Sequence, residues 1–246
     1  ARSVTEQLAA GKKDLLAKRP VHSYIAYFQA FTNTYAPVSY LEKIFTEAIQ
    51  DPDVRALSIA TRPDCLGSDV LELLERLNRI KPVWVELGLQ TVHEETARFI
   101  RRGYSLDVFD RAVADLRRLG ITVIVHVILF LPGETEGRML ETVDYLNSRD
   151  IQGIKLQLLH VLEGTDLAGI YRDHPFHTPD MEEYIRVLGR CIVRLRPDIA
   201  IHRLTGDGPK DLLIAPLWTG AKRTVLNRLN QYLKENDLWQ GKEYYG

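Results

Sequence analysis

The sequence predicts an α/β fold built on parallel strands. Apolar, β-branched segments alternate along the 246 residues with segments of helical periodicity, and this order is typical of a parallel sheet whose strands are joined by helices. The clear strands are expected at residues 21–28, 56–60, 83–89, 121–129 and 152–159, neighbouring one another in that order, and a short last strand at 200–203. Helices should cover the outside of the sheet.

The segment 83–91 shows how such a strand is built. Its side chains alternate between an aliphatic face and a second face with polar groups. The second face consists of Trp84, Glu86, Gly88 and Gln90. Thr91-x-x-Glu94 predicts a capping box that opens the next helix. Polar groups at the C-terminal end of a strand that leads into a helix lie where parallel α/β folds place their function.

A barrel, complete or partial, and an open doubly wound sheet both fit this alternation. The sequence contains neither a GxGxxG nor a Walker A loop, so the dinucleotide and P-loop versions of an open sheet lose their usual support. Polar residues also recur near the ends of successive strands. They are Glu86 with Gln90, His126, and Lys155 with Gln157. Each alone fits a satisfied polar group in the core, but the set favours the lumen of a barrel.

Charge and composition exclude several classes of protein. The formal net charge of -1 gives no indication of nucleic-acid binding and leaves only local basic patches open for it. The sequence shows no apolar run long enough to span a bilayer and no secretory signal, so no membrane association is expected. Cys65 and Cys191 stand far apart and outside any metal-ligand spacing, which predicts a cytoplasmic protein and no metal site among these residues.

Several short motifs resemble those of the radical S-adenosylmethionine (radical SAM) superfamily. They are Ala-Thr-Arg-Pro-Asp at 60–64, Glu-Leu-Gly-Leu-Gln-Thr at 86–91, Arg-Arg-Gly at 101–103, His126, and Leu-Pro-Gly-Glu at 131–134. The most similar branch is the one shared with the catalytic subunit of elongator, and within it the YhcC-type bacterial proteins. Segments 27–34, 153–157 and 215–218, together with His160, strengthen that narrower match. The resemblance runs from about residue 3 to about residue 232.

The resemblance implies a partial (βα)6 TIM-like barrel over residues 1–246, with the barrel at about 1–205 and a helical extension at about 206–246. It also implies a [4Fe-4S] cluster and S-adenosylmethionine (AdoMet), whose reductive cleavage gives a 5′-deoxyadenosyl radical, and an electron donor such as flavodoxin or ferredoxin. The family's cysteine triplet is absent from this sequence. The first strand and the cluster loop are therefore expected upstream of Ala1, and the chain alone is expected to be inactive.

The resemblance further implies roles for individual residues. Contacts with AdoMet are implied for Glu86, Gln90, Arg102, His126, Leu131 and Pro132. A position on the substrate side is implied for Arg62, Asp64, Lys155, Gln157 and His160. The glycine that the family places before Leu-Pro is Phe130 here, which predicts an altered adenine pocket. The resemblance assigns no catalytic residue.

Two other functions stay open on the sequence alone. A degenerate, non-enzymatic barrel would bind a nucleotide-like ligand or a protein partner. A barrel lyase would use Lys155, which lies in a predicted strand, to form a Schiff base. For a radical SAM enzyme, the sequence leaves both RNA and small molecules open as substrates.

Overall fold

The computed structural model describes residues 3–29, 31–206 and 208–245. The chain divides into two compact units. The first unit comprises Ala1–Gly88 and Tyr104–Ile124, and the second comprises Leu89–Gly103 and Val125–Gly246. Each unit is described by itself below.

The strands follow the predicted order. The main sheet runs β1-β2-β3-β4-β5-β7, and β6 and β8 form a separate antiparallel pair. The β1–β2, β2–β3 and β5–β7 pairs are parallel. The bounds are β1 Tyr24–Phe28, β2 Val54–Thr61, β3 Val83–Gln90, β4 Thr122–Leu129, β5 Gly153–Leu158, β6 Val161–Leu162, β7 Ala200–Arg203 and β8 Leu213–Ala215.

The helices occupy the predicted connections. The α-helices are α1 Val4–Leu16, α2 Val38–Ile49, α3 Ser68–Asn78, α4 Glu94–Phe99, α5 Leu106–Arg118, α6 Glu136–Asn147, α7 Asp166–Asp173, α8 Met181–Arg194 and α9 Lys222–Glu235, with 3-10 turns η1 Pro63–Cys65 and η2 Leu217–Gly220. Gly120, just after α5, has a φ of 69° and ends that helix in the left-handed conformation that glycine adopts without strain.

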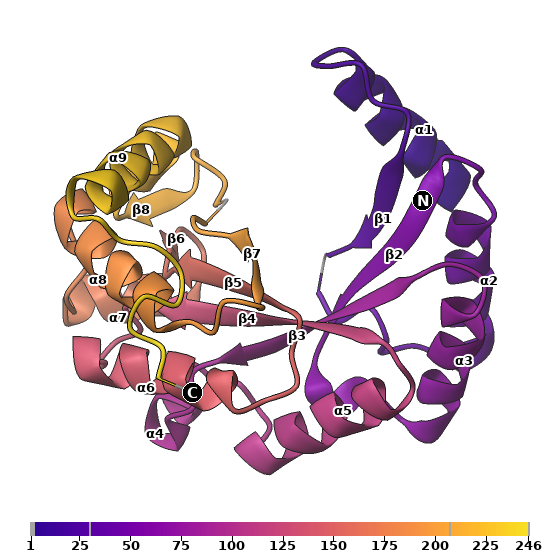
Figure 1. The fold of residues 1–246 in the computed structure, drawn as a ribbon, viewed down its shortest axis with the longest axis horizontal. Coiled ribbons are helices and arrows are strands. Elements are labelled where there is room, and N and C mark those ends of the chain that lie inside the picture. The colour runs from indigo at the N-terminus through magenta and orange to yellow at the C-terminus, as the bar shows by residue number, and fades with distance from the viewer. Residues whose placement is uncertain (1–2, 30, 207, 246) are drawn as a thin grey trace. The chain divides into compact units, whose positions relative to one another are not determined.

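In the first unit, α1, α2 and α3 lie side by side along β1 and β2 (Figure 1). The predicted capping box of α1 is present: the Ser3 hydroxyl accepts from the Glu6 amide, and the Glu6 carboxylate accepts from the Ser3 amide. Phe45 of α2 is fully buried and meets Phe28 of β1 edge-on, with ring centroids 5.0 Å apart. The core of this unit therefore forms where the apolar faces of α2 and α3 meet the sheet.

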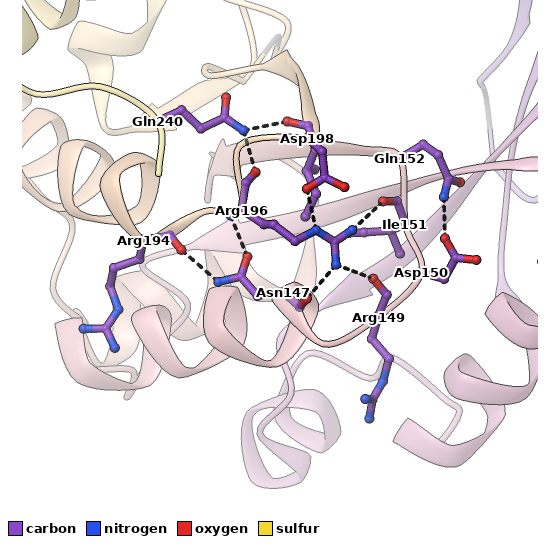
Figure 2. A network of polar contacts seen from close by, with 10 residues as sticks. Asn147, Arg149, Asp150, Ile151, Gln152, Arg194, Arg196, Asp198 and Gln240 are labelled. Carbon is purple, nitrogen blue, oxygen red and sulfur yellow. Dashed lines mark hydrogen bonds and ion pairs between the residues drawn. The ribbon is translucent and has the colours of Figure 1, made fainter. Parts of the chain in front are cut away.

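In the second unit, α8 packs against both α6 and α9 (Figure 1). Figure 2 shows how the C-terminal segment is fastened to this unit. Arg196 donates from its guanidinium to the carbonyls of Asn147 at 2.7 Å and Ile151 at 3.4 Å. Gln240 donates to the carbonyls of Arg196 at 2.9 Å and Ile199 at 2.7 Å. Since Ile151 lies two residues before β5 and Ile199 one residue before β7, this network holds the chain at the start of both strands.

The capping box expected at Thr91 and Glu94 is wrong. The helix begins at Glu94 itself, with His93 as its N-cap. Thr91 is fully buried, and its hydroxyl accepts from the His93 amide at 3.1 Å and donates to the Glu134 carboxylate. A contact with a residue 43 positions away outcompetes the local cap, and no local pattern announces such a contact.

None of the helices in the described part of the chain combines the length and the apolar character that crossing a bilayer requires.

Candidate cofactor-binding site

The strands β3 and β4 both end in unusual backbone conformations. Gln90, the last residue of β3, has a φ of 67°, and Phe130, which follows β4, has a φ of 61°. This left-handed region costs a residue with a Cβ about 1–2 kcal/mol relative to glycine. Such strain gathers at binding sites, where the surrounding structure holds it in place. Glycine adopts this conformation without strain, which explains why the resemblance predicts a glycine before Leu131-Pro132. In this chain Phe130 adopts the conformation instead.

A cavity of about 420 Å³ opens beside Gln90 in the second unit. This volume lies within the range of roughly 300–1,000 Å³ that is typical of small-molecule sites. Most of its wall is apolar and comes from α4, β4, the end of β5 and α7. The lining residues are Gln90, Phe99, Ile100, Arg101, Arg102, Ile128, Leu131, Leu159, Asp166, Leu167 and Ile170.

The side-chain amide of Gln90 is the informative polar group in this wall. Its oxygen is buried and accepts no hydrogen bond from any residue that the structure describes. Leaving a buried acceptor unsatisfied costs about 1–3 kcal/mol, and such groups in native proteins call for an explanation. A ligand in the cavity that donates a hydrogen bond to this oxygen would supply one.

Arg102 also lines the cavity, but its guanidinium supports the protein backbone. The side chain is 1% exposed. It donates to the carbonyls of Thr91 at 2.7 Å and Leu89 at 3.3 Å, and to the carboxylate of Glu94 at 2.8 Å. These bonds hold the residues on both sides of Gln90. The geometry is that of a residue that positions Gln90, and the contact with AdoMet that the resemblance implies for Arg102 stays a prediction.

An ion pair at the cavity joins α7 to the residues after α4. Arg101 and Asp166 approach to 2.6 Å between guanidinium nitrogen and carboxylate oxygen, and each side chain is 75% exposed. An exposed pair of this kind contributes about 0–1 kcal/mol and separates easily. Arg101 and Asp166 thus add charged groups to a wall that is otherwise mainly apolar.

The other residues predicted to contact the cofactor divide between the wall of this cavity and other parts of the structure. Leu131 is in the cavity wall, but Pro132 and His126 are not among the described residues that line it. Glu86, in the first unit, is 4% exposed, and its oxygens accept from the hydroxyls of Ser58 at 2.7 Å and Tyr27 at 2.9 Å. The cavity therefore brings together three of the six residues.

The residues predicted for the substrate side divide between the two units. In the first, Arg62 donates twice to Asp64, at 2.9 and 2.6 Å, and lies over the ring of Tyr104. The Arg62 guanidinium holds the pKa of Asp64 below its usual range. In the second unit, Lys155 on β5 is 5% exposed, and Gln157 and His160 are half-buried.

Comparison with protein families decides the identity of the fold. The family described as the Radical SAM superfamily matches residues 2–146, and the Radical_SAM C-terminal domain matches residues 151–235.

The chain belongs to the radical SAM superfamily.

Two bacterial relatives and one solved structure agree with this. The uncharacterized protein YtqA of Bacillus subtilis is 43% identical over 89% of this chain and 68% of its own length. The protein YhcC of Escherichia coli is 35% identical over 96% of this chain and 76% of its own length. An N-terminally deleted Elp3 of Methanocaldococcus infernus matches with a TM-score of 0.79 at 18% identity, over 94% of this chain and 58% of that chain. The predicted partial TIM-like barrel class and the elongator-like, YhcC-type branch are confirmed.

The radical SAM family implies AdoMet, and the cavity beside Gln90 suits part of it. Adenosine consists of a flat adenine ring with an exocyclic amine and of a ribose whose hydroxyl groups can also donate hydrogen bonds. An apolar wall with one unsatisfied acceptor matches that donor set. Gln90, Ile128, Leu131 and Leu159 are the residues that would hold it.

The family also implies a [4Fe-4S] cluster, and the described residues do not fit one. No group of three or more His, Cys, Asp or Glu residues within them could hold a metal ion. Cluster ligation needs thiolates, yet burial raises the pKa of the Cys191 thiol to about 12, and burial followed by the nearby Asp64 carboxylate raises that of Cys65. No step through a cluster is assigned to these residues.

Several residues of the cavity escaped prediction from the sequence. Phe99, Leu167 and Ile170 look like ordinary apolar residues of amphipathic helices, so no local signal marks them. Arg101 precedes the predicted Arg102, and only its positive φ of 55° and its pairing with Asp166 distinguish it. Gly88 and Gln90 follow the alternation of an ordinary strand. The sequence therefore does not indicate that the strand ends in a left-handed backbone conformation.

Proposed function

We propose that this chain supplies the AdoMet-binding barrel of a radical SAM enzyme, with the adenosyl part of AdoMet in the cavity beside Gln90. The observation that carries the proposal is the buried Gln90 amide oxygen, which has no partner among the described residues and stands at a strained strand end. A binding residue explains both the strain and the unsatisfied group, because a ligand would recover the cost of each.

Each residue of the cavity then has a distinct part. The aliphatic side chains of Ile128, Leu131 and Leu159 would pack against adenine and exclude water. The Gln90 oxygen would accept from an adenine amine or a ribose hydroxyl. Arg102 would keep Gln90 in place through its bonds to the carbonyls of Leu89 and Thr91. Contacts of His126 and Pro132 with the rest of AdoMet are part of the proposal on the strength of the family resemblance. The contact implied for Glu86 is left out of it, because both Glu86 oxygens already accept from hydroxyl groups of the protein.

The chemistry belongs to the cofactors. In such an enzyme, AdoMet and a reduced [4Fe-4S] cluster would together supply a 5′-deoxyadenosyl radical for hydrogen abstraction from a substrate. We propose that residues other than those described hold the cluster, and that a flavodoxin- or ferredoxin-like donor reduces it. We also propose the division into a barrel at about 1–205 and an extension at about 206–246. The chain itself contributes binding, orientation and exclusion of water.

Binding of AdoMet to the purified chain tests the proposal by titration calorimetry. Gln90→Gly removes the amide and relieves the positive φ, so it should fold as well as the parent while binding AdoMet at least tenfold more weakly, as the loss of one hydrogen bond of about 1.4 kcal/mol implies. The control is Gln231→Ala, which changes an exposed amide on α9 and should leave binding unchanged. Glycine is not used at this position because it would weaken the helix.

The same titration separates the proposal from a barrel that binds a protein partner instead. Absence of AdoMet binding to the parent, or equal affinity in the parent and Gln90→Gly, would favour the non-enzymatic alternative. Reduction by borohydride of a Schiff base formed at Lys155 would favour the lyase. The residues that line the cavity beside Gln90 do not support that reaction.

A further inference from the structure

The cavity beside Gln90 is bounded on one side by α7, a short helix with little packing of its own. Of the eight residues of α7, which the structure describes in full, only Ala168 is buried, whereas α6 buries five of twelve. An isolated helix as short as α7 is marginal in water, because nucleation of a helix is costly and few residues remain to extend it. The stability of α7 therefore depends on the contacts that its faces make.

Two faces of α7 make different contacts. Ala168 and Tyr171 pack into a small apolar cluster with the strands β6 and β8. Leu167 and Ile170 stand three residues apart and line the cavity instead. Ile170 is still 38% exposed. A ligand in the cavity would cover this second face and stabilise α7, since removal of apolar surface from water is favourable.

The sequence of α7 weakens the helix at its centre. Gly169 stands in the interior of the helix, where glycine lowers helix stability relative to alanine. A Cβ at this position would meet nothing within 4 Å, so packing does not require a glycine there. A short helix with one buried residue and an interior glycine belongs to the least stable elements of a fold, from which the lids of binding sites are drawn.

The ion pair of Arg101 and Asp166 fastens the first residue of α7 to the chain after α4. Arg101 has a φ of 55° and follows Ile100, the C-cap of α4. The Arg102 amide donates to the Ala97 carbonyl at 2.9 Å, which completes a helix ending whose left-handed position is usually glycine. An arginine at this strained position is explained by the use of its side chain, which reaches Asp166. The pair is exposed, and such pairs separate easily, as the release of a lid requires.

We infer that α7 is a lid over the cavity beside Gln90 and that Arg101 and Asp166 form its latch. The lid opens by local unfolding of α7, which admits the ligand, and it closes when the ligand covers Leu167 and Ile170. The inference rests on the proposed function only in naming AdoMet as that ligand. Gly169 then has a role as well, because it keeps the opening of α7 frequent.

Amide hydrogen exchange of α7, followed by mass spectrometry on the purified chain, tests the lid without a ligand. In the parent, α7 should exchange at least about tenfold faster than α6. Arg101→Met removes the latch and should speed the exchange of α7 about two- to fivefold, which corresponds to about 0.4–1 kcal/mol for an exposed ion pair. Arg98→Met is the matched control, because Arg98 is exposed on α4 and does not line the cavity, and its α7 should exchange like that of the parent.

Gly169→Ala should act in the opposite direction. It stabilises the helix without a clash and should slow the exchange of α7 about two- to fivefold. Gly11→Ala is its control, because Gly11 stands in the interior of α1, where a Cβ also meets nothing within 4 Å. This control should leave the exchange of α7 unchanged. Saturating AdoMet should slow the exchange of α7 in the parent about tenfold or more, since a ligand that binds only the closed form stabilises it.

Three results would overturn the inference. They are exchange of α7 as slow as that of α6 in the ligand-free parent, equal exchange in Arg101→Met and Arg98→Met, and binding of AdoMet that leaves the exchange of α7 unchanged. Absence of AdoMet binding would count against the proposed function alone, because the ligand-free comparisons still decide whether α7 opens as a latched lid.

Discussion

Glu86 and Gln90 stand on the same strand, and their hydrogen bonding differs completely. Glu86 is 4% exposed, and both of its oxygens accept from hydroxyl groups, those of Ser58 and Tyr27. Gln90 has a buried amide oxygen that no described residue satisfies, on a backbone with a φ of 67°. The sequence implied the same role for both residues, and their surroundings separate them.

The difference teaches how to read a polar residue in a sheet of this kind. A buried carboxylate with satisfied oxygens contributes to the stability of its own unit. An unsatisfied amide in a strained backbone costs stability, and it persists where a ligand makes use of it. We therefore expect substitutions of Glu86 to act mainly on folding and substitutions of Gln90 to act mainly on binding.

The largest effect on stability is expected at Glu86. Glu86→Leu leaves the buried Ser58 hydroxyl and the Tyr27 hydroxyl without this acceptor, so the free energy of unfolding should fall by about 2–4 kcal/mol. Urea unfolding measures it. Glu95→Leu, at a carboxylate that is 83% exposed, is the control and should change stability by less than about 0.5 kcal/mol. Equal losses in the two variants would remove the contrast with Gln90.

The next effect sharpens the account of the strand ends. The Thr91 hydroxyl donates to the Glu134 carboxylate and so connects the residues after β3 with those after β4. A double-mutant cycle with Thr91→Val and Glu134→Ala should give a coupling of about 1.5–3 kcal/mol, as for a hydrogen bond to a charged group. Chemical denaturation of the four proteins yields this value. A coupling near zero would mean that the two strand ends are held independently.

Phe130 tests the strain at the second strand end. Substitution of a buried residue by glycine normally destabilises more than substitution by alanine. At a φ of 61° the order should reverse, with Phe130→Gly about 1 kcal/mol more stable than Phe130→Ala. Both variants lose the contacts of the ring with Tyr184 and His177, so their difference isolates the backbone. Thermal unfolding suffices, and the ordinary order would disprove the strain.

The smallest effect concerns a salt bridge in the first unit. Burial is the largest single influence on the pKa of Asp51 and would raise it, but the hydrogen bonds from Lys12 and from the Asp53 amide, together with the charge of Lys12, outweigh burial, and the pKa is lowered. A lowered carboxyl pKa gives stability above its unfolded value of about 3.9, and this stability is lost as the pH falls through the folded value. Asp51→Asn should therefore be less stable than the parent at pH 7, by up to about 1 kcal/mol, and nearly equal to it at pH 2.

A constant difference between the two proteins at both pH values would show that Asp51 acts through its backbone contact with Asp53 rather than through Lys12. The pKa of Lys12 is raised, chiefly by its hydrogen bonds to Asp51 and Asp53. Its share of the stability is present below its unfolded pKa and is lost only as the pH rises above the folded value. Lys12→Met should nevertheless converge with the parent at low pH, because protonation of Asp51 and Asp53 removes the charges with which Lys12 pairs.

The sequence was sufficient for the fold because the signals there are local. Alternation along 83–90 and the continuous apolar run of β4 predict strands, and the capping box at Ser3 predicts where α1 begins. Errors arose where a distant residue took over a local role. Thr91 carries a capping pattern, but its hydroxyl donates to Glu134, and the helix begins three residues later.

The candidate site was only partly predictable. Gln90 and Leu131 stand at strand ends, where their position along the chain already suggests function. Phe99, Leu167 and Ile170 reach the same cavity from helices, and a sequence gives no sign of which apolar residues line a cavity rather than fill a core.

One paired measurement tests the central claim most directly. AdoMet affinity by calorimetry and unfolding free energy in urea are measured on the same preparations of Gln90→Gly and Glu86→Gln. The account predicts that Gln90→Gly is at least as stable as the parent and binds AdoMet at least tenfold more weakly. Glu86→Gln should be less stable and keep its affinity within about threefold, a change below 1 kcal/mol. Unchanged AdoMet affinity in Gln90→Gly, or a loss confined to Glu86→Gln, would contradict it.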